Sequence, residues 1–177
     1  MELWRLLDDI FSHGWCRLVG IASPASDYLQ ALPHWLAEEH PALRRICVLY
    51  SAGGTFGWQL ARGILKSVLA VTGKSVELVP INSSLENYDS ILRTLFDIDP
   101  EVVVLAVTFS DELGIMRTRE HWPSTVRVVA AVAAGLGDFS AELAQIADGV
   151  LGPSQWEPGV TFPNVIGPAS DWFLDSA

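Results

Sequence analysis

Short apolar runs alternate along the chain with longer segments in which apolar residues recur every three or four positions. The short runs contain consecutive Val, Leu, Ile and Ala residues, which is typical of strands buried on both faces of a sheet. The segments between them have the period of amphipathic helices. The expected strands cover residues 17–22, 44–50, 75–81, 101–107, 127–132 and 149–152.

Local chemistry marks several ends of the expected helices. Ser26 or Asp27 is placed to cap a helix that runs to about residue 40, where Pro41 stops it. Gly73 follows the second helical segment, and glycine readily adopts the left-handed backbone that ends many helices. The expected helices cover residues 27–40, 56–71, 85–98, 111–119 and 139–147.

The alternation of strands and helices predicts an α/β fold, with a doubly wound, mainly parallel sheet of about five or six strands and helices on both faces. Right-handed crossovers leave few other topologies. The expected α/β domain covers residues 17–152. Residues 1–16 predict a short amphipathic helix, and residues 153–177, rich in proline and glycine, predict a connector or tail.

Composition narrows the classes of protein that fit. Of the 177 residues, 50% are hydrophobic and 18% are charged, which excludes a disordered chain. The net charge of −10 argues against nucleic acid and anionic lipid as partners, because both attract Lys and Arg. No stretch approaches the roughly 18 apolar residues of a membrane span. The first residues carry acids where a secretory signal carries a basic start.

The usual catalytic templates are not met. The four histidines fall on separate elements without HExxH spacing, and no G-x-S-x-G elbow is present. Asp111 and Glu112 are neighbours at a helix start, where side chains point apart and favour the helix dipole instead of forming a catalytic pair. Cys16 and Cys47 form no C-x-x-C motif, and Cys47 in a strand is expected to be buried. We therefore expect a protein that is not an enzyme and has no metal or cofactor.

A binding site is expected where ligands bind open parallel sheets, beyond the carboxyl ends of the strands. The loops at these positions, residues 51–57, 108–112, 133–138 and 153–157, contain glycines, hydroxyl groups and aromatic rings. Such surfaces suit a small ligand with an apolar part and a few hydrogen-bonding groups. The predicted ligand-binding residues are Ser51, Gly54, Thr55, Phe56, Thr108, Phe109, Gln155 and Trp156.

Each part of this site also has a structural interpretation. Gly53-Gly54-Thr55 fits an anion site on free N–H groups, and it equally fits a tight turn with an N-cap. It lacks GxxxxGKS/T and GxGxxG, which gives little support for a nucleotide. The segment 108–110 is either a ligand contact or a loop. Phe56 and Trp58 are candidates to face a cleft, with at least one in the core, and Trp156 either contacts the ligand or packs against a neighbouring element.

The order of four segments resembles the type I periplasmic binding proteins, most nearly the substrate-binding components of branched-chain amino acid and amide ABC transporters. The segments are SPASDYLQALPHWL, RRICVLYSAGGTFGWQLARGI, DSILRTLFDIDPEVVVLAVT and ADGVLGPSQWEPG. The resemblance covers about residues 17–160 and corresponds to the second lobe of such proteins. It implies two α/β lobes with the solute between them, the first lobe holding the amino and carboxyl groups of an amino acid.

By position, the resemblance places an aromatic–glycine pair of the family on Phe56-Gly57, where Phe replaces the usual Tyr and lacks its hydroxyl. It places the contact after the central strand on Thr108 and Phe109, and the last loop of the site on Gln155 and Trp156. The first lobe expected from the family is not in this sequence. The chain is therefore expected to be a fragment or a reduced lobe, and its ends to cover surface that a first lobe or a dimer partner would bury.

The resemblance implies a small-molecule solute, an ABC permease as partner and a periplasmic or extracytoplasmic location, while a cytoplasmic location stays open because no signal peptide is read. Two other functions fit the same fold. A flavodoxin-like protein would use the loop at residues 51–55 to hold a cofactor phosphate. A sensory or protein-interaction domain would keep the fold without a ligand. Fold alone does not choose among them.

Overall fold

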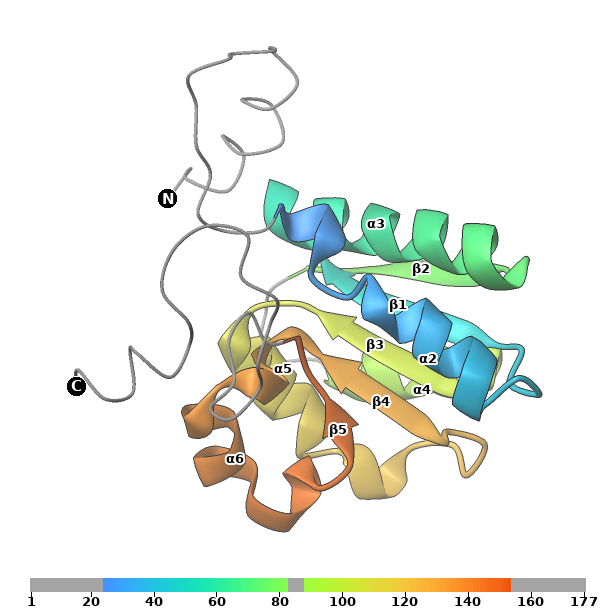
Figure 1. The fold of residues 1–177 in the computed structure, drawn as a ribbon. Helices are drawn as coiled ribbons and strands as arrows, with labels where there is room; N and C mark the ends of the chain where they lie inside the picture. The colour runs from blue at the N-terminus through green and yellow to red at the C-terminus, as the bar shows by residue number, and fades with distance from the viewer. Residues whose placement is uncertain (1–23, 83–87, 154–177) are drawn as a thin grey trace, which may run out of the picture.

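The computed structural model describes residues 24–82 and 88–153, which form a parallel α/β sheet with helices on both faces (Figure 1). Within these residues the sheet has five strands in the order β2-β1-β3-β4-β5, and every neighbouring pair is parallel. The predicted doubly wound fold is confirmed. The strands are β1 (Ile46–Ser51), β2 (Val76–Ile81), β3 (Val102–Ala106), β4 (Val128–Ala131) and β5 (Val150–Leu151).

Helices cover both faces of the sheet. The α-helices are α2 (Ala31–Glu39), α3 (Thr55–Thr72), α4 (Tyr88–Ile98), α5 (Phe109–Met116) and α6 (Gly137–Leu143). The 3-10 helices are η1 (Ala25–Asp27), η2 (Arg119–His121), η3 (Val132–Gly135) and η4 (Ala144–Ala147). The buried residues of α2 and α3 share one core cluster with the sheet, and those of α4, α5 and α6 share the other.

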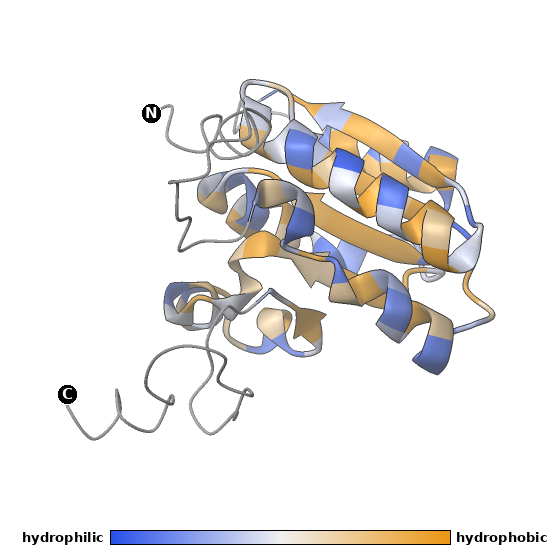
Figure 2. Ribbon diagram, turned by 45° about the horizontal axis from the view of Figure 1, so that its top comes forward, coloured by the Kyte–Doolittle hydropathy of each residue, from blue (hydrophilic) through white to orange (hydrophobic). Residues whose placement is uncertain are grey.

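Alternate residues of the central strand enter the two cores. Val103 and Leu105 of β3 pack with α4, α5 and α6, whereas Val102 and Val104 pack with α2 and α3. All five residues of β3 are buried, so a polar residue anywhere in this strand would be placed in an apolar layer. Figure 2 shows the corresponding hydrophobic band through the middle of the sheet.

The first helix begins later than the sequence predicts. Ser26 and Asp27 belong to the 3-10 turn η1, while α2 begins at Ala31 after Gln30 and has no side-chain cap. The prediction that Ser26 or Asp27 caps a helix is therefore wrong. The physical reason is tertiary: η1 packs against α3, where a β-carbon on Gly63 would collide with the Ser26 carbonyl.

Other boundaries shift by a few residues. The helix predicted at residues 111–119 begins at Phe109, because Thr108 caps it, and ends at Met116. The helix predicted at 139–147 is α6 followed by the separate 3-10 turn η4. Within residues 24–82 and 88–153, no helix combines the length and the apolar character needed to cross a bilayer. The predicted strand at 17–22, the helix at 1–16 and nearly all of the predicted tail lie outside the described residues.

Candidate functional site

The order of the strands reverses direction between β1 and β3. From β1 the chain adds β2 on one side, and from β3 it adds β4 and β5 on the other. The carboxyl ends of β1 and β3 lie side by side, with Tyr50 paired to Ala106. This is the switch point at which open α/β sheets bind ligands, because the loops after the two strands diverge there. The loops that contain Ser51 and Thr108 are therefore brought to one edge.

Gly57 lets the start of α3 approach both strand ends. A β-carbon on Gly57 would lie 2.7 Å from the carbonyl oxygen of Ala106 and 2.9 Å from the backbone nitrogen of Ser51. Contacts this short do not occur for real side chains, so only glycine fits without a shift of the backbone. The glycine of the predicted aromatic–glycine pair thus has a packing role in this chain.

The loop after β1 forms a turn and an N-cap. Ala52 donates its N–H to the Ile81 carbonyl at 2.9 Å, and Gly54 is the extended N-cap residue of α3, without a side chain to cap the helix. Gly53 and Gly54 are exposed, with open space around both positions. The Ser51 hydroxyl is buried and has no hydrogen-bond partner within the described residues. The exposed backbone of Gly53 and Gly54, not this hydroxyl, is the polar part of the loop that faces solvent.

The two aromatic residues that open α3 have different surroundings. Phe56 is half-buried, packs against the core under α2 and α3, and meets Tyr28 edge to face at 5.7 Å between ring centroids. Trp58 is 42% exposed, lies 5.5 Å from the Tyr50 ring, and has the Arg62 guanidinium 5.9 Å from its own centroid. Phe56 contributes to packing, and Trp58 presents its ring to solvent.

Thr108 and Phe109 follow the central strand, and the structure separates their roles. The Thr108 hydroxyl accepts the Asp111 N–H at 3.3 Å as the N-cap of α5, and it donates to an Asp111 carboxylate oxygen at 2.7 Å. Its hydrogen bonds are thus used within the fold. The Phe109 ring is 38% exposed at the first position of α5.

Glu112 is a polar residue of this edge that sequence reasoning assigned only to the helix dipole, without a role in the site. Its side chain is fully buried, and its two carboxylate oxygens accept the N–H groups of Val132 at 3.1 Å and Ala133 at 2.9 Å. Burial raises the pKa of Glu112 to about 8, although the two backbone hydrogen bonds act in the opposite direction. The available signal in the sequence was that the apolar residues Leu113, Ile115 and Met116 follow Glu112, and the structure buries the whole segment 111–116.

The expectation that Asp111 and Glu112 interact mainly with the helix dipole is thus wrong for Glu112. Asp111 does lie in the first turn of α5 and hydrogen-bonds its cap, as that expectation requires. Glu112 instead reaches across to η3, since the adjacent end of β4 exposes two backbone donors beside it. The two carboxylates point to different partners and form no catalytic pair.

The loops after β4 and β5 also meet closely. A β-carbon on Gly135 would lie 2.6 Å from the Pro153 carbonyl oxygen, and one on Gly152 would lie 2.6 Å from the Gly135 nitrogen. Gly152 and Pro153, which follow β5, therefore lie beside η3. The predicted site residues Gln155 and Trp156 follow immediately, but they lie outside the described residues.

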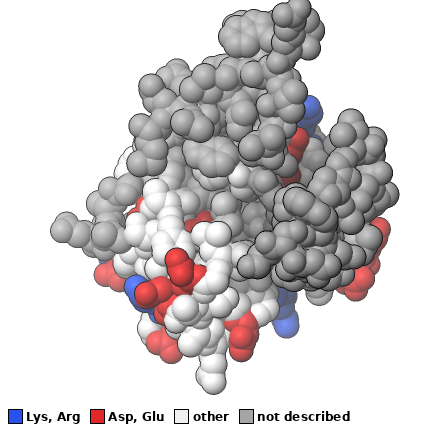
Figure 3. Space-filling view, turned by 60° about the vertical axis from the view of Figure 1, so that its left-hand side comes forward, with Lys and Arg blue, Asp and Glu red and all other residues white. Residues whose placement is uncertain are grey.

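The loop residues of the described carboxyl edge are uncharged, and acids follow them in the first turns of two helices, Asp111 and Glu112 in α5 and Asp138 in α6. Residues 51–55, 108–110 and 132–137 include no Lys, Arg, Asp, Glu or His. Hydroxyl groups and backbone amides lie there beside the exposed side chains of Phe109 and Leu136, which are 38% and 55% exposed. Among the described residues no group of His, Cys, Asp and Glu could hold a metal ion. Figure 3 shows Asp and Glu side chains among the described residues of the face that it presents.

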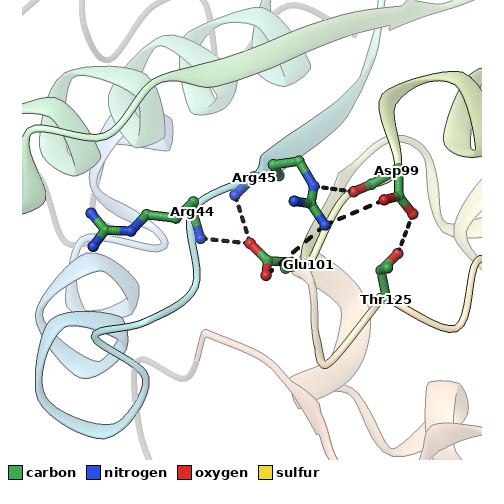
Figure 4. Close-up of polar contacts among 5 residues, drawn as sticks. All are labelled: Arg44, Arg45, Asp99, Glu101 and Thr125. Atoms are coloured by element: carbon green, nitrogen blue, oxygen red, sulfur yellow. Dashed lines mark hydrogen bonds and ion pairs between the residues drawn. The ribbon is translucent and has the colours of Figure 1, made fainter.

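A polar network at the opposite, amino edge of the sheet is satisfied within the protein (Figure 4). A Glu101 carboxylate oxygen accepts the backbone N–H groups of Arg44 at 2.7 Å and Arg45 at 3.0 Å. The Asp99 carboxylate accepts the Thr125 hydroxyl at 2.6 Å and pairs with the Arg45 guanidinium at 3.3 Å. The backbone hydrogen bonds lower the pKa of Glu101. This network joins the segments that enter β1, β3 and β4, which is a structural role.

Comparison with known proteins supports the fold. No family model matches the sequence, and no curated protein matches it. Solved structures do match. A leucine-binding protein of Thermotoga maritima has a TM-score of 0.70 at 13% identity, over 86% of this chain and 42% of that one. An amino acid ABC transporter substrate-binding protein of Pseudomonas fluorescens has a TM-score of 0.66 at 20% identity, over 80% and 38%. This chain has the type I periplasmic binding protein fold.

The resemblance expected from the order of segments is confirmed at the level of the fold. A fatty acid ABC transporter substrate-binding protein of Thermomonospora curvata also matches, with a TM-score of 0.58 at 16% identity over 72% of this chain and 33% of that one. The similar structures are thus named for chemically different solutes. This chain spans about two fifths or less of the length of each of the three.

Proposed function

We propose that this chain is a solute-binding lobe of an ABC-transporter-type substrate-binding protein. The solute that fits best is an amino acid or a related small polar molecule with an apolar part. The observation that carries the proposal is the switch point between β1 and β3, where loop residues 51–55 and 108–110 carry no charged side chain, on the fold that two amino acid-binding proteins share. The similar structures are binding proteins, which supports a role without catalysis.

The described residues offer both hydrogen-bonding groups and apolar side chains to a solute at this edge. The exposed backbone amide groups at Gly53 and Gly54 offer hydrogen bonds to a polar group, and the unpartnered Ser51 hydroxyl is buried beneath this loop. The Phe109 ring and Leu136 offer apolar contact on the neighbouring loops. Since this part of the edge carries no charged side chain, the charged groups of an amino acid would be held by the other lobe or by residues outside the described ranges.

We assign the chain to the second lobe, with a first lobe and an ABC permease as partners and a periplasmic location. The similar structures are about twice as long as this chain, in accordance with a two-lobed protein. One lobe removes only one side of the solute from water. Binding to this chain alone should therefore be weak, in the millimolar range or roughly −4 kcal/mol.

The test is a calorimetric and thermal-shift screen of amino acids, their amides and short fatty acids. It is performed on this chain and on the chain combined with a matching first lobe. We expect millimolar binding of one class to the chain alone, and much tighter binding when the first lobe is present, because closure adds contacts and excludes water. Failure of every solute to bind the two-lobed protein would disprove the proposal and favour a sensory or interaction domain.

A second candidate is a flavodoxin-like cofactor protein. The observed strand order 2-1-3-4-5 is also that of flavodoxin, whose cofactor binds at the same switch point. The purified protein would then show the visible absorption of a flavin, or bind added flavin mononucleotide. A colourless protein that binds amino acids and not flavin excludes this alternative.

A further inference from the structure

Glu112 joins two loops of the candidate site. It belongs to the first turn of α5, two residues after the last of the exposed residues 108–110. Its two oxygens accept the N–H groups of Val132 and Ala133, the first residues of η3. We call these two hydrogen bonds the Glu112 bridge. The bridge links the loop after β3 to the loop after β4, which continues to the exposed Leu136.

The surroundings of Glu112 do not supply a positive charge. Its side chain is 0% exposed, and no Lys, Arg or His within the described residues forms an ion pair with it. A buried carboxylate without a cation is costly unless it gains hydrogen bonds or takes up a proton. The two amide donors of the Glu112 bridge are the compensation that the structure provides.

Other titratable groups lie on the elements around Glu112. Asp111 and Arg117 share α5 with it, Tyr88 packs from α4 against Gly114, and Asp138 and Glu142 lie on α6. Arg117 pairs with Glu142 at 3.0 Å. None of these groups contributes to the pKa shift of Glu112, which comes from burial and is reduced by the two amide bonds. The titration of Glu112 is therefore governed by its burial and by the bridge.

We propose that Glu112 is a positioning residue of the candidate site, and that gain or loss of its proton changes how firmly η3 is held against α5. In the ionised form both oxygens accept an N–H, and both bonds are charge-assisted and short. In the protonated form the hydroxyl oxygen is a poor acceptor, so one of the two amides is held weakly. An effect of this protonation on solute binding rests on the proposed function, whereas the effect on the Glu112 bridge does not.

The test is an NMR pH titration of the wild-type chain in the absence of any solute, from about pH 6 to about pH 10. The probes are the amide resonances of Val132 and Ala133 and the side-chain carboxyl carbon of Glu112. We expect all three to titrate with one shared midpoint, and the amide protons to move downfield as the pH rises. Amides that do not move, or that titrate with a midpoint different from that of the carboxyl carbon, would overturn the proposal.

Two variants separate the bridge from other titrations. In Glu112→Gln the pH-dependent shift of both amides should disappear, because the side chain no longer titrates. In Asp138→Asn, which removes an exposed acid from the first turn of α6, the shift should remain unchanged. Retention of the shift in Glu112→Gln would contradict the proposal. If Glu112→Gln does not fold, the wild-type carboxyl and amide midpoints still decide the question. A failed solute screen would leave this result unaffected.

Discussion

Gly57 lies so close to the end of β3 that a β-carbon on it would stand 2.7 Å from the carbonyl oxygen of Ala106. The same β-carbon would lie 2.9 Å from the backbone nitrogen of Ser51 at the end of β1. The atoms it would meet belong to the backbone of two central strands and cannot turn away as a side chain does. One residue thus sets the distance between the start of α3 and the sheet.

Gly57→Ala is therefore expected to destabilise the fold. Overpacking of a rigid site costs about 1–3 kcal/mol, and urea unfolding followed by circular dichroism measures it. Gly53→Ala is the matched control, because a β-carbon there meets nothing within 4 Å. Its free energy of unfolding should stay within about 0.5 kcal/mol of wild type. Equal stability of the two variants would show that α3 can move away from the strands.

Glu101 should stabilise the amino edge in a pH-dependent way. The backbone N–H groups of Arg44 and Arg45 lower its pKa in the folded protein. Its contribution is therefore present above the unfolded pKa, near the ordinary value of 4.5, and is lost as the pH falls through the folded value. Glu101→Gln should lower the free energy of unfolding by about 1 kcal/mol at neutral pH.

The check is urea unfolding of wild type and Glu101→Gln at several pH values. The difference between them should shrink at acidic pH, where both side chains are neutral. Glu38→Gln, at an exposed position on α2, is the control for the loss of a surface carboxylate and should change the free energy of unfolding at neutral pH by less than about 0.5 kcal/mol. A difference of constant size down to pH values of about 2 would mean that charge plays no part in the contribution of Glu101.

The sequence predicted the sheet well, because buried parallel strands require uninterrupted apolar residues. Val102–Ala106 contains no polar residue, and the run identifies it as a central strand before its neighbours are known. Helix starts were harder, because they depend on tertiary contacts. The turn at Ala25–Asp27 packs against α3 at Gly63, and nothing in the local sequence near Ser26 indicates that contact.

The site was predictable as an edge but not as a set of contacts. The topological rule places Ser51 and Thr108 at one end of the sheet, and the structure agrees. The same rule does not predict that the Thr108 hydroxyl forms its hydrogen bonds with Asp111. It also does not say that Glu112 turns inward, because its partners are backbone amides 20 and 21 residues away in the chain. The roles of Gln155 and Trp156 stay predictions.

Glu112 should give the protein a stability that decreases from mildly acidic to mildly alkaline pH. The pKa of Glu112 in the folded protein is about 8, above the ordinary value of 4.5. Between these values unfolding releases a proton, so this group's contribution is full below about 4.5 and is lost as the pH rises through about 8. The change is on the order of a few kcal/mol.

Comparison of wild type with Glu112→Gln isolates that contribution. The difference in the free energy of unfolding should favour wild type most at acidic pH, fall as the pH rises to about 8, and then remain level. Urea unfolding at a series of pH values measures it. A difference that grows with pH would mean that the Glu112 bridge stabilises the ionised form more than burial destabilises it.

Cys47 should be unreactive in the folded protein. Its side chain is fully buried in β1, and burial, with a smaller contribution from the charge of Glu77, raises its pKa to about 12. The thiolate is the reactive form, and at pH 8 about one such thiol in ten thousand is ionised. In a Cys16→Ser variant, DTNB should release almost no colour until urea unfolds the protein. Rapid labelling without urea would show that β1 opens readily.

The last prediction concerns the apolar part of the proposed solute site and uses two exposed phenylalanines. Phe109 is 38% exposed at the start of α5, at the carboxyl edge, whereas Phe96 is 59% exposed near the end of α4, towards the amino edge. Removal of the Phe109 ring takes apolar contact away from a bound solute, while removal of the Phe96 ring does not. Phe109→Ala should therefore weaken binding of the solute identified by the screen by about fivefold to tenfold, or roughly 1 kcal/mol. Phe96→Ala should leave the dissociation constant of that solute unchanged.

Calorimetry on both variants, together with a thermal unfolding curve for each, separates a lost contact from a lost fold. If both variants bind as the wild type does, the solute does not touch the ring of Phe109, and the apolar wall of the site belongs to other residues.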